Sequence, residues 1–276
     1  IMASKAIRAA LADAGIPYGE IQQAYASYVF GDSACGQAAL YRVGMTGIPL
    51  FNVNNNCSSG SSALFLARQA VLSGSVDCAL AFGFEEMRPG ALGAVWDDRT
   101  SPLLEMEEQL ERIVPGVPPA SNAHRLFGSA ASAYIEKTGA NPDIFAKVAV
   151  KTRRHAMNNP LAMFRQPLTV DEVMQSPVIF APYLTCLEAC PPSCGAAAAV
   201  VCSDAFARRH GLARGIPIRA QAMATDRPAR NDNPIDLAGA DMTRNAAAQV
   251  YAQAGIGPQD VDVVELHDCF AQNELL

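Results

Sequence analysis

One cysteine of this sequence stands where covalent chemistry is favoured. Cys57 follows Asn54-Asn55-Asn56 and precedes Ser58-Ser59-Gly60-Ser61-Ser62, between a predicted strand (51–53) and a predicted helix (58–73). The first amides of a helix have no intrahelical partner, so they favour a thiolate and can hold an oxyanion formed from a thioester. An isolated cysteine is more often a structural thiol. The tiny residues around Cys57 leave room for a substrate, and we interpret it as a nucleophile.

His267 is the second candidate for a catalytic role. It lies in Glu265-Leu266-His267-Asp268-Cys269-Phe270, after an apolar run that predicts a strand over Val261–Leu266. Functional sites gather at the carboxyl ends of strands in open α/β sheets. A histidine beside a carboxylate can donate to a developing oxyanion or transfer a proton. A structural role is the alternative for such a histidine.

The other cysteines have simpler interpretations. Cys186, Cys190 and Cys194 are spaced by four residues, which on a helix would form a stripe and suggest a metal site. Pro191-Pro192 breaks any helix there, and no nearby histidine completes a set of four ligands. We interpret them as packing residues and expect no metal, with metal binding as the minor alternative. Core or loop thiols are expected at Cys35, Cys78 and Cys202.

Several charged groups also have an ordinary interpretation. Glu85-Glu86 follows a buried strand, where we expect structural hydrogen bonds rather than acid-base catalysis. The basic cluster from Lys151 to His155 is interpreted as a solvated helix face, with contact to an anionic cofactor phosphate as the alternative. Three histidines in polar surroundings are expected to be exposed: His124, His155 and His210.

Composition narrows the class of protein. The chain has 276 residues, 50% of them apolar and 17% charged, which is typical of a globular protein with a large core. A net charge of -6 and the lack of a basic stripe exclude a nucleic-acid channel. No apolar run is long enough to span a membrane. A core of this size needs no disulfides, so the eight cysteines are expected to be reduced and the protein intracellular.

The order of patterns predicts an α/β fold in three regions. A first core region covers 1–87, with helices over 1–14 and 58–73 and a buried strand over 76–83. Residues 88–182 are richer in charge and proline and are interpreted as an inserted loop or cap domain, with helices over 122–138 and 143–157. The core pattern resumes over 183–276, with a strand over 196–202.

A weak internal repeat appears when the chain is aligned on itself at an offset of 240 residues. Ala14-Gly15-Ile16 falls on Ala254-Gly255-Ile256, and Phe30 falls on Phe270. Two ordinary helix-to-strand units would be the simpler explanation. Duplication predicts two similar α/β halves, of which the second is incomplete in these 276 residues.

The motifs resemble those of the thiolase superfamily, and of its sterol carrier protein X branch in particular. The run 54–69 resembles the nucleophile loop and helix of that family, and His267-Asp268-Cys269-Phe270 with Asn273-Glu274-Leu275 resembles its histidine motif. The segments 158–160, 171–174 and 190–198 are also similar, although Cys194 stands where the family has Asp. The resemblance covers nearly the whole chain.

The resemblance implies a fold, an activity and partners. It implies two halves stacked in α-β-α-β-α layers with an inserted loop domain, and cleavage of 3-ketoacyl-CoA by coenzyme A. Cys57 would carry the acyl group, and His267 would contribute to the oxyanion site. Coenzyme A and acyl-CoA would be substrates, with no permanently bound cofactor, and the enzyme would be a homodimer. The location implied is cytoplasmic, or peroxisomal in a eukaryote.

Two further elements of the resembled family are not among these residues: a Gly-His-Pro motif and a late Cys-x-Gly motif. The chain also opens at Ile1 inside a predicted helix and stops at Leu276 after a helix-like segment. We therefore expect both ends to continue in a longer protein, and residues 1–276 alone to be neither stable nor active. A thiolase-like scaffold that binds acyl-CoA or a partner protein without catalysis is the alternative function.

Overall fold

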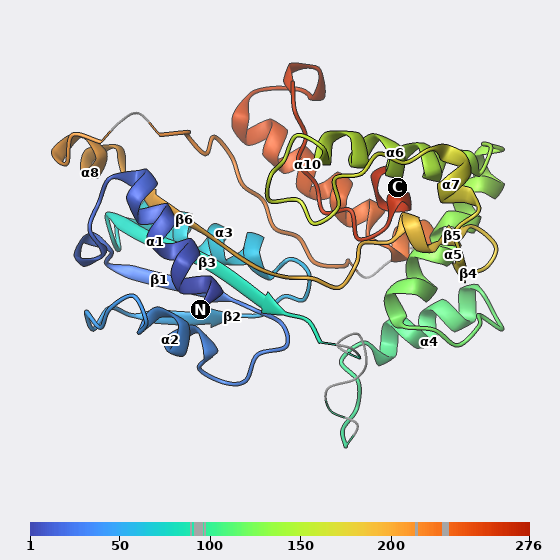
Figure 1. The fold of residues 1–276 in the computed structure, drawn as a ribbon, viewed down its shortest axis with the longest axis horizontal. Helices are drawn as coiled ribbons and strands as arrows, with labels where there is room; N and C mark the ends of the chain where they lie inside the picture. The colour runs from blue at the N-terminus through green and yellow to red at the C-terminus, as the bar shows by residue number, and fades with distance from the viewer. Residues whose placement is uncertain (89, 91–95, 97, 213–214, 228–231) are drawn as a thin grey trace. The chain divides into compact units, whose positions relative to one another are not determined.

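The computed structural model describes residues 1–88, 90, 96, 98–212, 215–227 and 232–276 (Figure 1). The chain forms two compact units. The first contains Ile1–Ala91 and Pro192–Met223, and the second contains Leu92–Pro191 and Ala224–Leu276. The three sequence regions 1–87, 88–182 and 183–276 stay a prediction.

The first unit is built on a four-stranded sheet with the order β2-β1-β3-β6 (Figure 1). β1 (Gln23–Ser27) pairs in parallel with β2 (Leu50–Val53) on one side and with β3 (Cys78–Glu86) on the other. β6 (Cys194–Cys202) pairs antiparallel with β3 along its whole length. Every predicted strand of this region is therefore present, with small shifts at the ends.

Helices cover both faces of this sheet, because successive side chains of β1 and β3 point to opposite faces. α1 (Met2–Ala14) covers one face, where its Ile7 and Leu11 are buried. α3 (Ser59–Leu72) covers the other face with a stripe of alanines. The first face buries Ala24, Ala26, Leu80 and Phe82, and the second buries Tyr25, Ala79 and Ala81. A mixed sheet covered on both faces confirms the α/β class predicted for this region.

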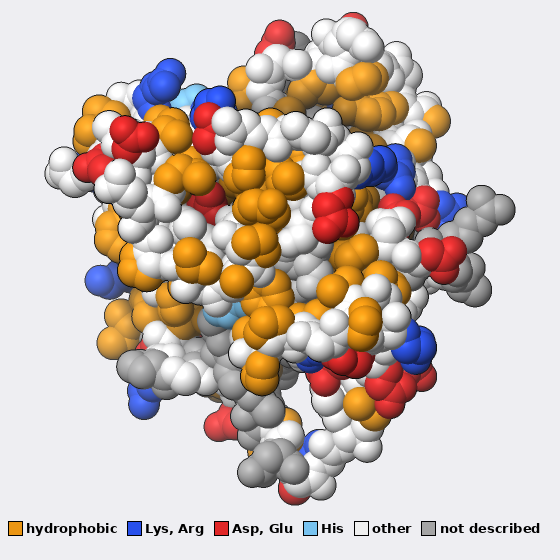
Figure 2. Space-filling model, turned by 90° about the vertical axis from the view of Figure 1, so that its right-hand side faces the viewer, with side chains coloured by type: hydrophobic (Ala, Val, Ile, Leu, Met, Phe, Trp, Pro, Cys, Tyr) orange, Lys and Arg blue, Asp and Glu red, His pale blue; other side chains and the backbone are white. Residues whose placement is uncertain are grey.

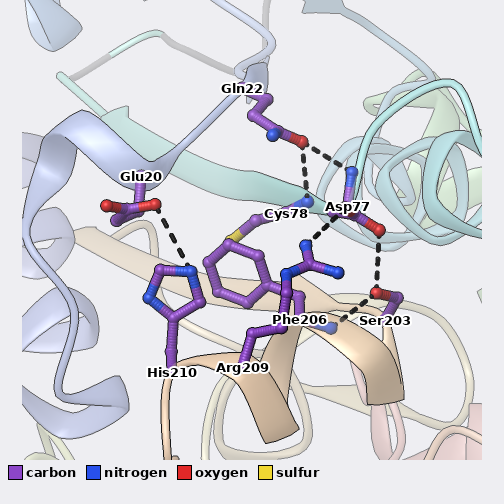
Figure 3. Close-up of polar contacts among 8 residues, drawn as sticks. All are labelled: Glu20, Gln22, Asp77, Cys78, Ser203, Phe206, Arg209 and His210. Atoms are coloured by element: carbon purple, nitrogen blue, oxygen red, sulfur yellow. Dashed lines mark hydrogen bonds and ion pairs between the residues drawn. The ribbon is translucent and has the colours of Figure 1, made fainter.

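A polar network fixes α8 (Asp204–Arg209) to the start of β3, as Figure 3 shows. The Asp77 carboxylate accepts from Arg209 Nη2 at 2.6 Å and from Ser203 Oγ at 3.0 Å. The backbone amide of Asp77 in turn donates to Gln22 Oε1 at 2.6 Å. Arg209 and Ser203 also lower the pKa of Asp77. The network therefore joins a helix after β6 to the loop before β1.

An aromatic contact completes the attachment of this helix (Figure 3). Phe206 is 1% exposed, and the ring of His210 stacks on it with centroids 4.1 Å apart. His210 Nε2 lies 3.6 Å from a carboxylate oxygen of Glu20. His210 is exposed, as expected, although one face of its ring is covered.

The second unit is mainly helical. α5 (Asn122–Thr138) has the predicted bounds, and α6 (Asp143–Ala156) ends one residue before the predicted end. β4 (Val178–Phe180) and β5 (Leu184–Thr185) form a two-stranded antiparallel sheet. The described residues of this unit also form α4 (Leu104–Ile113), α7 (Val170–Met174), α9 (Pro234–Leu237) and α10 (Ala240–Ala254).

Buried side chains of the second unit form two clusters. Phe145, Ala131 and Val148 from α5 and α6 surround Ala271, whereas Phe180 and Leu184 surround Phe270. On the face of the molecule drawn in Figure 2, apolar side chains form a band between scattered acidic and basic groups. Among the residues that the structure describes, no helix has the length and apolar character needed to cross a bilayer.

The internal repeat is visible in the backbone. α1 ends at Gly15, which has a φ of 71°, and a 3-10 helix follows over Tyr18–Glu20. α10 ends at Gly255, which has a φ of 68°, and a 3-10 helix follows over Pro258–Asp260. Both positive φ values lie in the left-handed region that glycine adopts without strain. Helix, glycine and 3-10 turn therefore recur at the offset found in the sequence.

The prediction of a strand over Val261–Leu266 is wrong for this structure, since these residues belong to no strand. Val263 is 81% exposed and Val264 is 69% exposed. The corresponding β1 is buried and has a hydrogen-bonded strand on each side. An extended segment becomes a strand only through backbone bonds to neighbours, and no described strand pairs with 261–266. The apolar pattern of this segment therefore did not determine whether it pairs with other strands, because pairing depends on neighbours elsewhere in the fold.

Candidate active site

Cys57 stands in the loop between β2 and α3, with its side chain exposed. It precedes the N-cap Ser58, so it lies just before the helix rather than inside it. Asn56 has a φ of 51°, a left-handed conformation that Asn adopts more readily than most residues. This turn directs the chain from the sheet into α3 and leaves the thiol accessible.

Asparagine and serine side chains brace the loop around Cys57. The backbone amide of Asn55 donates to Ser59 Oγ at 2.8 Å, and its side-chain amide donates to Ser62 Oγ at 3.0 Å. Ser58 Oγ donates back to the Asn55 carbonyl at 2.8 Å. Ser59 and Ser62 are buried, so these bonds fix the loop to the first turn of α3. The asparagines and serines around Cys57 therefore fix the conformation of the loop that carries it.

Small residues pack together where β1 and β3 approach the start of α3. Ser27, at the end of β1, is 3% exposed and donates from Oγ to the Phe82 carbonyl at 3.2 Å. A Cβ atom at Gly83 would overlap Ser27 Oγ, and one at Gly60 would lie 4.0 Å from the same oxygen. No local pattern in the sequence predicts this contact, because Ser27, Gly60 and Gly83 are far apart in the chain. Ser27 thus fills the space between β3 and the start of α3.

Glu85 has the structural role that was predicted for it. Its Oε2 accepts from the backbone amide of Val29 at 2.8 Å and from that of Phe30 at 3.4 Å. These bonds fix the backbone of the segment that follows β1. Glu86 makes an exposed ion pair with Arg88 at 3.1 Å.

Two other cysteines of the first unit differ from Cys57 in their surroundings. Burial raises the pKa of the Cys78 thiol to about 12, with a smaller contribution from nearby Cys202. Burial also raises the pKa of Cys202. Because the thiolate is the reactive form, these two thiols are poor nucleophiles. They are core thiols, as predicted.

His267 belongs to the second unit, whereas Cys57 belongs to the first. Its side chain is exposed, and its backbone carbonyl accepts a hydrogen bond from Asn273 Nδ2 at 2.6 Å. Asn273 stands in the 3-10 helix Ala271–Glu274, which follows directly after the motif. The bond closes a compact turn beneath the histidine.

Phe270 anchors the same turn. It is 5% exposed, and its ring lies 5.3 Å from that of Phe127 and 5.5 Å from that of His124. His124 is half-buried, so the prediction that it is exposed is wrong. Burial lowers its pKa, and its Nδ1 lies 2.8 Å from Ser121 Oγ. Its place at the start of α5 turns the ring towards the core rather than solvent.

Charged residues surround Asp268, which follows the histidine. Lys151 of α6 forms a bidentate ion pair with Glu274. The pKa of Asp268 rises to about 6, first through burial and then through the nearby Glu274 carboxylate, with Lys151 opposing the shift. Asp268 Oδ1 is buried and has no hydrogen-bond partner. Lys151, predicted as a solvated residue, therefore holds the motif's Glu274 in place.

The buried carboxylate of Glu188 is hydrogen-bonded to the 3-10 helix that follows His267. Glu188 is 4% exposed, and its Oε2 accepts from the Thr185 amide at 3.0 Å and from Gln272 Nε2 at 3.1 Å. Burial raises its pKa, and these hydrogen bonds oppose the shift. No pattern in the sequence had singled out Glu188 or Gln272, because their contact depends on the fold.

The spaced cysteines do not share a helix. Cys186 begins a 3-10 helix that ends at Glu188, and Cys194 begins β6. Within the described part of the chain, no three His, Cys, Asp or Glu side chains are grouped to hold a metal ion. Cys186, Cys190 and Cys194 are all exposed, so the interpretation of these three cysteines as packing residues is wrong for this structure.

Fold and site together define an α/β protein that presents an exposed cysteine between strand β2 and the start of α3. The chain belongs to the thiolase family. The family model described as "Thiolase, N-terminal domain" matches residues 1–205, and "Thiolase C-terminal domain-like" matches residues 225–276.

Curated relatives agree with this assignment. The chain is 47% identical over 281 residues to "Sterol carrier protein 2" of Gallus gallus, covering 100% of this chain and 51% of the relative. It is 41% identical to "Non-specific lipid-transfer protein-like 2" of Caenorhabditis elegans, covering 100% and 68%. It is 35% identical to "Benzoylsuccinyl-CoA thiolase subunit BbsB" of Thauera aromatica, covering 93% and 63%. The chain thus spans about half the length of the sterol carrier protein relatives.

A solved structure shows the same fold. The chain superposes on the structure named "Ltp2-ChsH2(DUF35) aldolase" with a TM-score of 0.75 at 23% identity, covering 98% of this chain and 68% of that one. The predicted thiolase-like α/β fold is therefore confirmed, as is the resemblance to the sterol carrier protein branch.

Proposed function

We propose that this protein is an acyl-CoA acyltransferase of the 3-ketoacyl-CoA thiolase type, with Cys57 as the acyl carrier. The single observation that carries the proposal is the exposed Cys57 thiol in a braced loop before α3. Membership of the thiolase family supports the reaction class. A relative whose name contains "acetyl-CoA acetyltransferase" adds support at 33% identity.

The proposed reaction has two halves. The Cys57 thiolate attacks the 3-keto carbon, the bond between carbons 2 and 3 breaks, and the departing two-carbon fragment is protonated to acetyl-CoA. The thiolate of coenzyme A then attacks the thioester on Cys57, and the cysteine leaves as a thiolate. We propose that His267 donates to the oxygen that becomes negatively charged. Its exposed side chain and fixed backbone are consistent with that role.

Substrates and assembly belong to the same proposal. Acyl-CoA and coenzyme A are the substrates, no cofactor is bound permanently, and the active form is a homodimer. We also propose a cytoplasmic location, or a peroxisomal one in a eukaryote, which fits an exposed catalytic thiol that must stay reduced. Subcellular fractionation tests the location.

Mass spectrometry of the full-length protein tests the acyl carrier. Incubation with acyl-CoA should add the mass of one acyl group to wild type and to Cys194→Ala, an exposed cysteine of the same unit. Cys57→Ala should gain no mass. Acylation of the Cys57→Ala protein would overturn the proposal.

A non-catalytic scaffold that binds acyl-CoA or a partner protein is the second candidate. One observation favours it: the Thauera aromatica relative is named as a subunit. The same mass experiment separates the two, because a scaffold would bind acyl-CoA without a covalent adduct. An aldolase, the class named for the similar structure, would cleave its substrate without acylating Cys57.

A further inference from the structure

Two cysteines of the second unit lie opposite each other on neighbouring strand-like segments. Ala189 and Phe270 form an isolated antiparallel bridge. The backbone amide of Cys190 donates to the Cys269 carbonyl at 2.9 Å. In an antiparallel pair, the residue after one bridge partner faces the residue before the other, so Cys190 faces Cys269.

This register places the two side chains within reach of a disulfide. Opposite residues of an antiparallel pair have Cα atoms roughly 4.5–5.5 Å apart and side chains on one face. A disulfide spans Cα separations of roughly 4.4–6.8 Å. The bond therefore needs no large movement of the backbone. Both residues are thiols in this structure.

Neighbouring residues fix this register from both sides. Phe270 and Ala271 are 5% and 4% exposed and anchor one segment in the core. Pro191-Pro192 restricts the backbone that follows Cys190. Cys190 is exposed and Cys269 half-exposed, so a small oxidant can reach the pair.

We propose that Cys190 and Cys269 are an oxidation site at which a hydroperoxide closes a reversible disulfide. One thiolate attacks a peroxide oxygen, the O–O bond breaks, and a sulfenic acid forms with release of water or an alcohol. The second thiolate attacks that sulfur and displaces water as the S–S bond forms. Two thiols are oxidised and one hydroperoxide is reduced, and a dithiol reductant reverses the step. The bond ties the residue two positions after His267 to the segment before β6.

Differential alkylation of the full-length protein tests the site. Cysteines are alkylated with one reagent after hydrogen peroxide treatment, reduced with dithiothreitol, and alkylated with an isotopically heavy reagent. Fragmentation mass spectrometry then reads each cysteine. Cys190 and Cys269 should carry the heavy label together, and the oxidised protein should melt at a higher temperature than the reduced one. This experiment does not depend on thiolase activity.

Variants identify the partners. Cys190→Ser should remove the heavy label from Cys269, whereas Cys186→Ser, which changes a nearby exposed cysteine, should leave both labels unchanged. Pairing of Cys190 with Cys186 or Cys194 in wild type would overturn the proposal. So would recovery of Cys190 and Cys269 as thiols or as irreversibly oxidised acids. The wild-type labelling pattern decides the matter even if a variant fails to fold.

Discussion

The side-chain amide of Asn273 donates a 2.6 Å hydrogen bond to the backbone carbonyl of His267, six residues earlier in the chain. The bond closes the turn between the exposed histidine and the 3-10 helix that contains Asn273. Phe270 and Ala271 bury the middle of this turn. The backbone of His267 is therefore fixed while its imidazole faces solvent.

Removal of this hydrogen bond should affect turnover more than folding. A single hydrogen bond contributes about 0.5–1.5 kcal/mol, so we expect Asn273→Ala to lower kcat by about 3- to 10-fold through a less ordered His267. KM should change little. The matched control is Asn159→Ala, an exposed asparagine elsewhere in this unit that should leave kcat unchanged. Equal losses in both variants would contradict a positioning role for Asn273.

Replacement of His267 should reduce catalysis without loss of stability. Because loss of one oxyanion donor costs about 100-fold in rate or more, we expect a drop of that size for His267→Ala. The side chain is exposed, so Tm should stay close to wild type. His155→Ala, at another exposed histidine of the unit, serves as the control. A large fall in Tm with normal turnover would show that His267 is structural.

Asp268 should make stability depend on pH. Its pKa rises from 3.8 to about 6 in the folded protein. The folded state therefore holds a proton that the unfolded state has lost, and stability falls as pH rises through this range. Asp268→Asn keeps a neutral group at every pH, so it should raise Tm at about pH 7.5 and change it little at about pH 4.

Thermal denaturation of wild type and Asp268→Asn at about pH 7.5 and about pH 4 tests this prediction. The control is Asp262→Asn, which changes an exposed carboxylate nearby and should show no such pH dependence. A variant that is less stable than wild type at the higher pH would mean that the Asp268 carboxylate is stabilised by its surroundings, contrary to the argument from burial.

The close contact between Gly83 and Ser27 should limit the size of residue 83. A methyl group there would overlap Ser27 Oγ and push it towards Gly60 at the start of α3. Overpacking of this kind costs about 1–3 kcal/mol, and we expect Gly83→Ala to lower the free energy of unfolding by that amount. Cys57 should also react more slowly with iodoacetamide.

A second strand glycine controls for the backbone effect. Gly195 in β6 pairs with β3, and a Cβ atom there would meet nothing within 4 Å. Gly195→Ala should therefore leave both stability and the reactivity of Cys57 near their wild-type values. If Gly83→Ala behaves in the same way, the contact with Ser27 does not constrain the loop.

The sequence by itself determined the local elements and the identity of the candidate nucleophile. Helical periodicity placed α5 and α6 almost to the residue, and the apolar run 76–83 predicted the first part of β3, residues 78–83. Such patterns are readable because period 3.6 and period 2 reflect which face of an element is buried. The small residues around Cys57 are adjacent to it in the chain, so they too could be recognised from the sequence alone.

Tertiary structure decided what depends on partners distant in the chain. It left Val261–Leu266 without a paired strand, turned His124 into the core, and joined Lys151 to Glu274. It also set Cys190 opposite Cys269. Backbone pairing and long-range ion pairs form between residues that no local period relates, because these contacts exist only when the fold brings the two groups together.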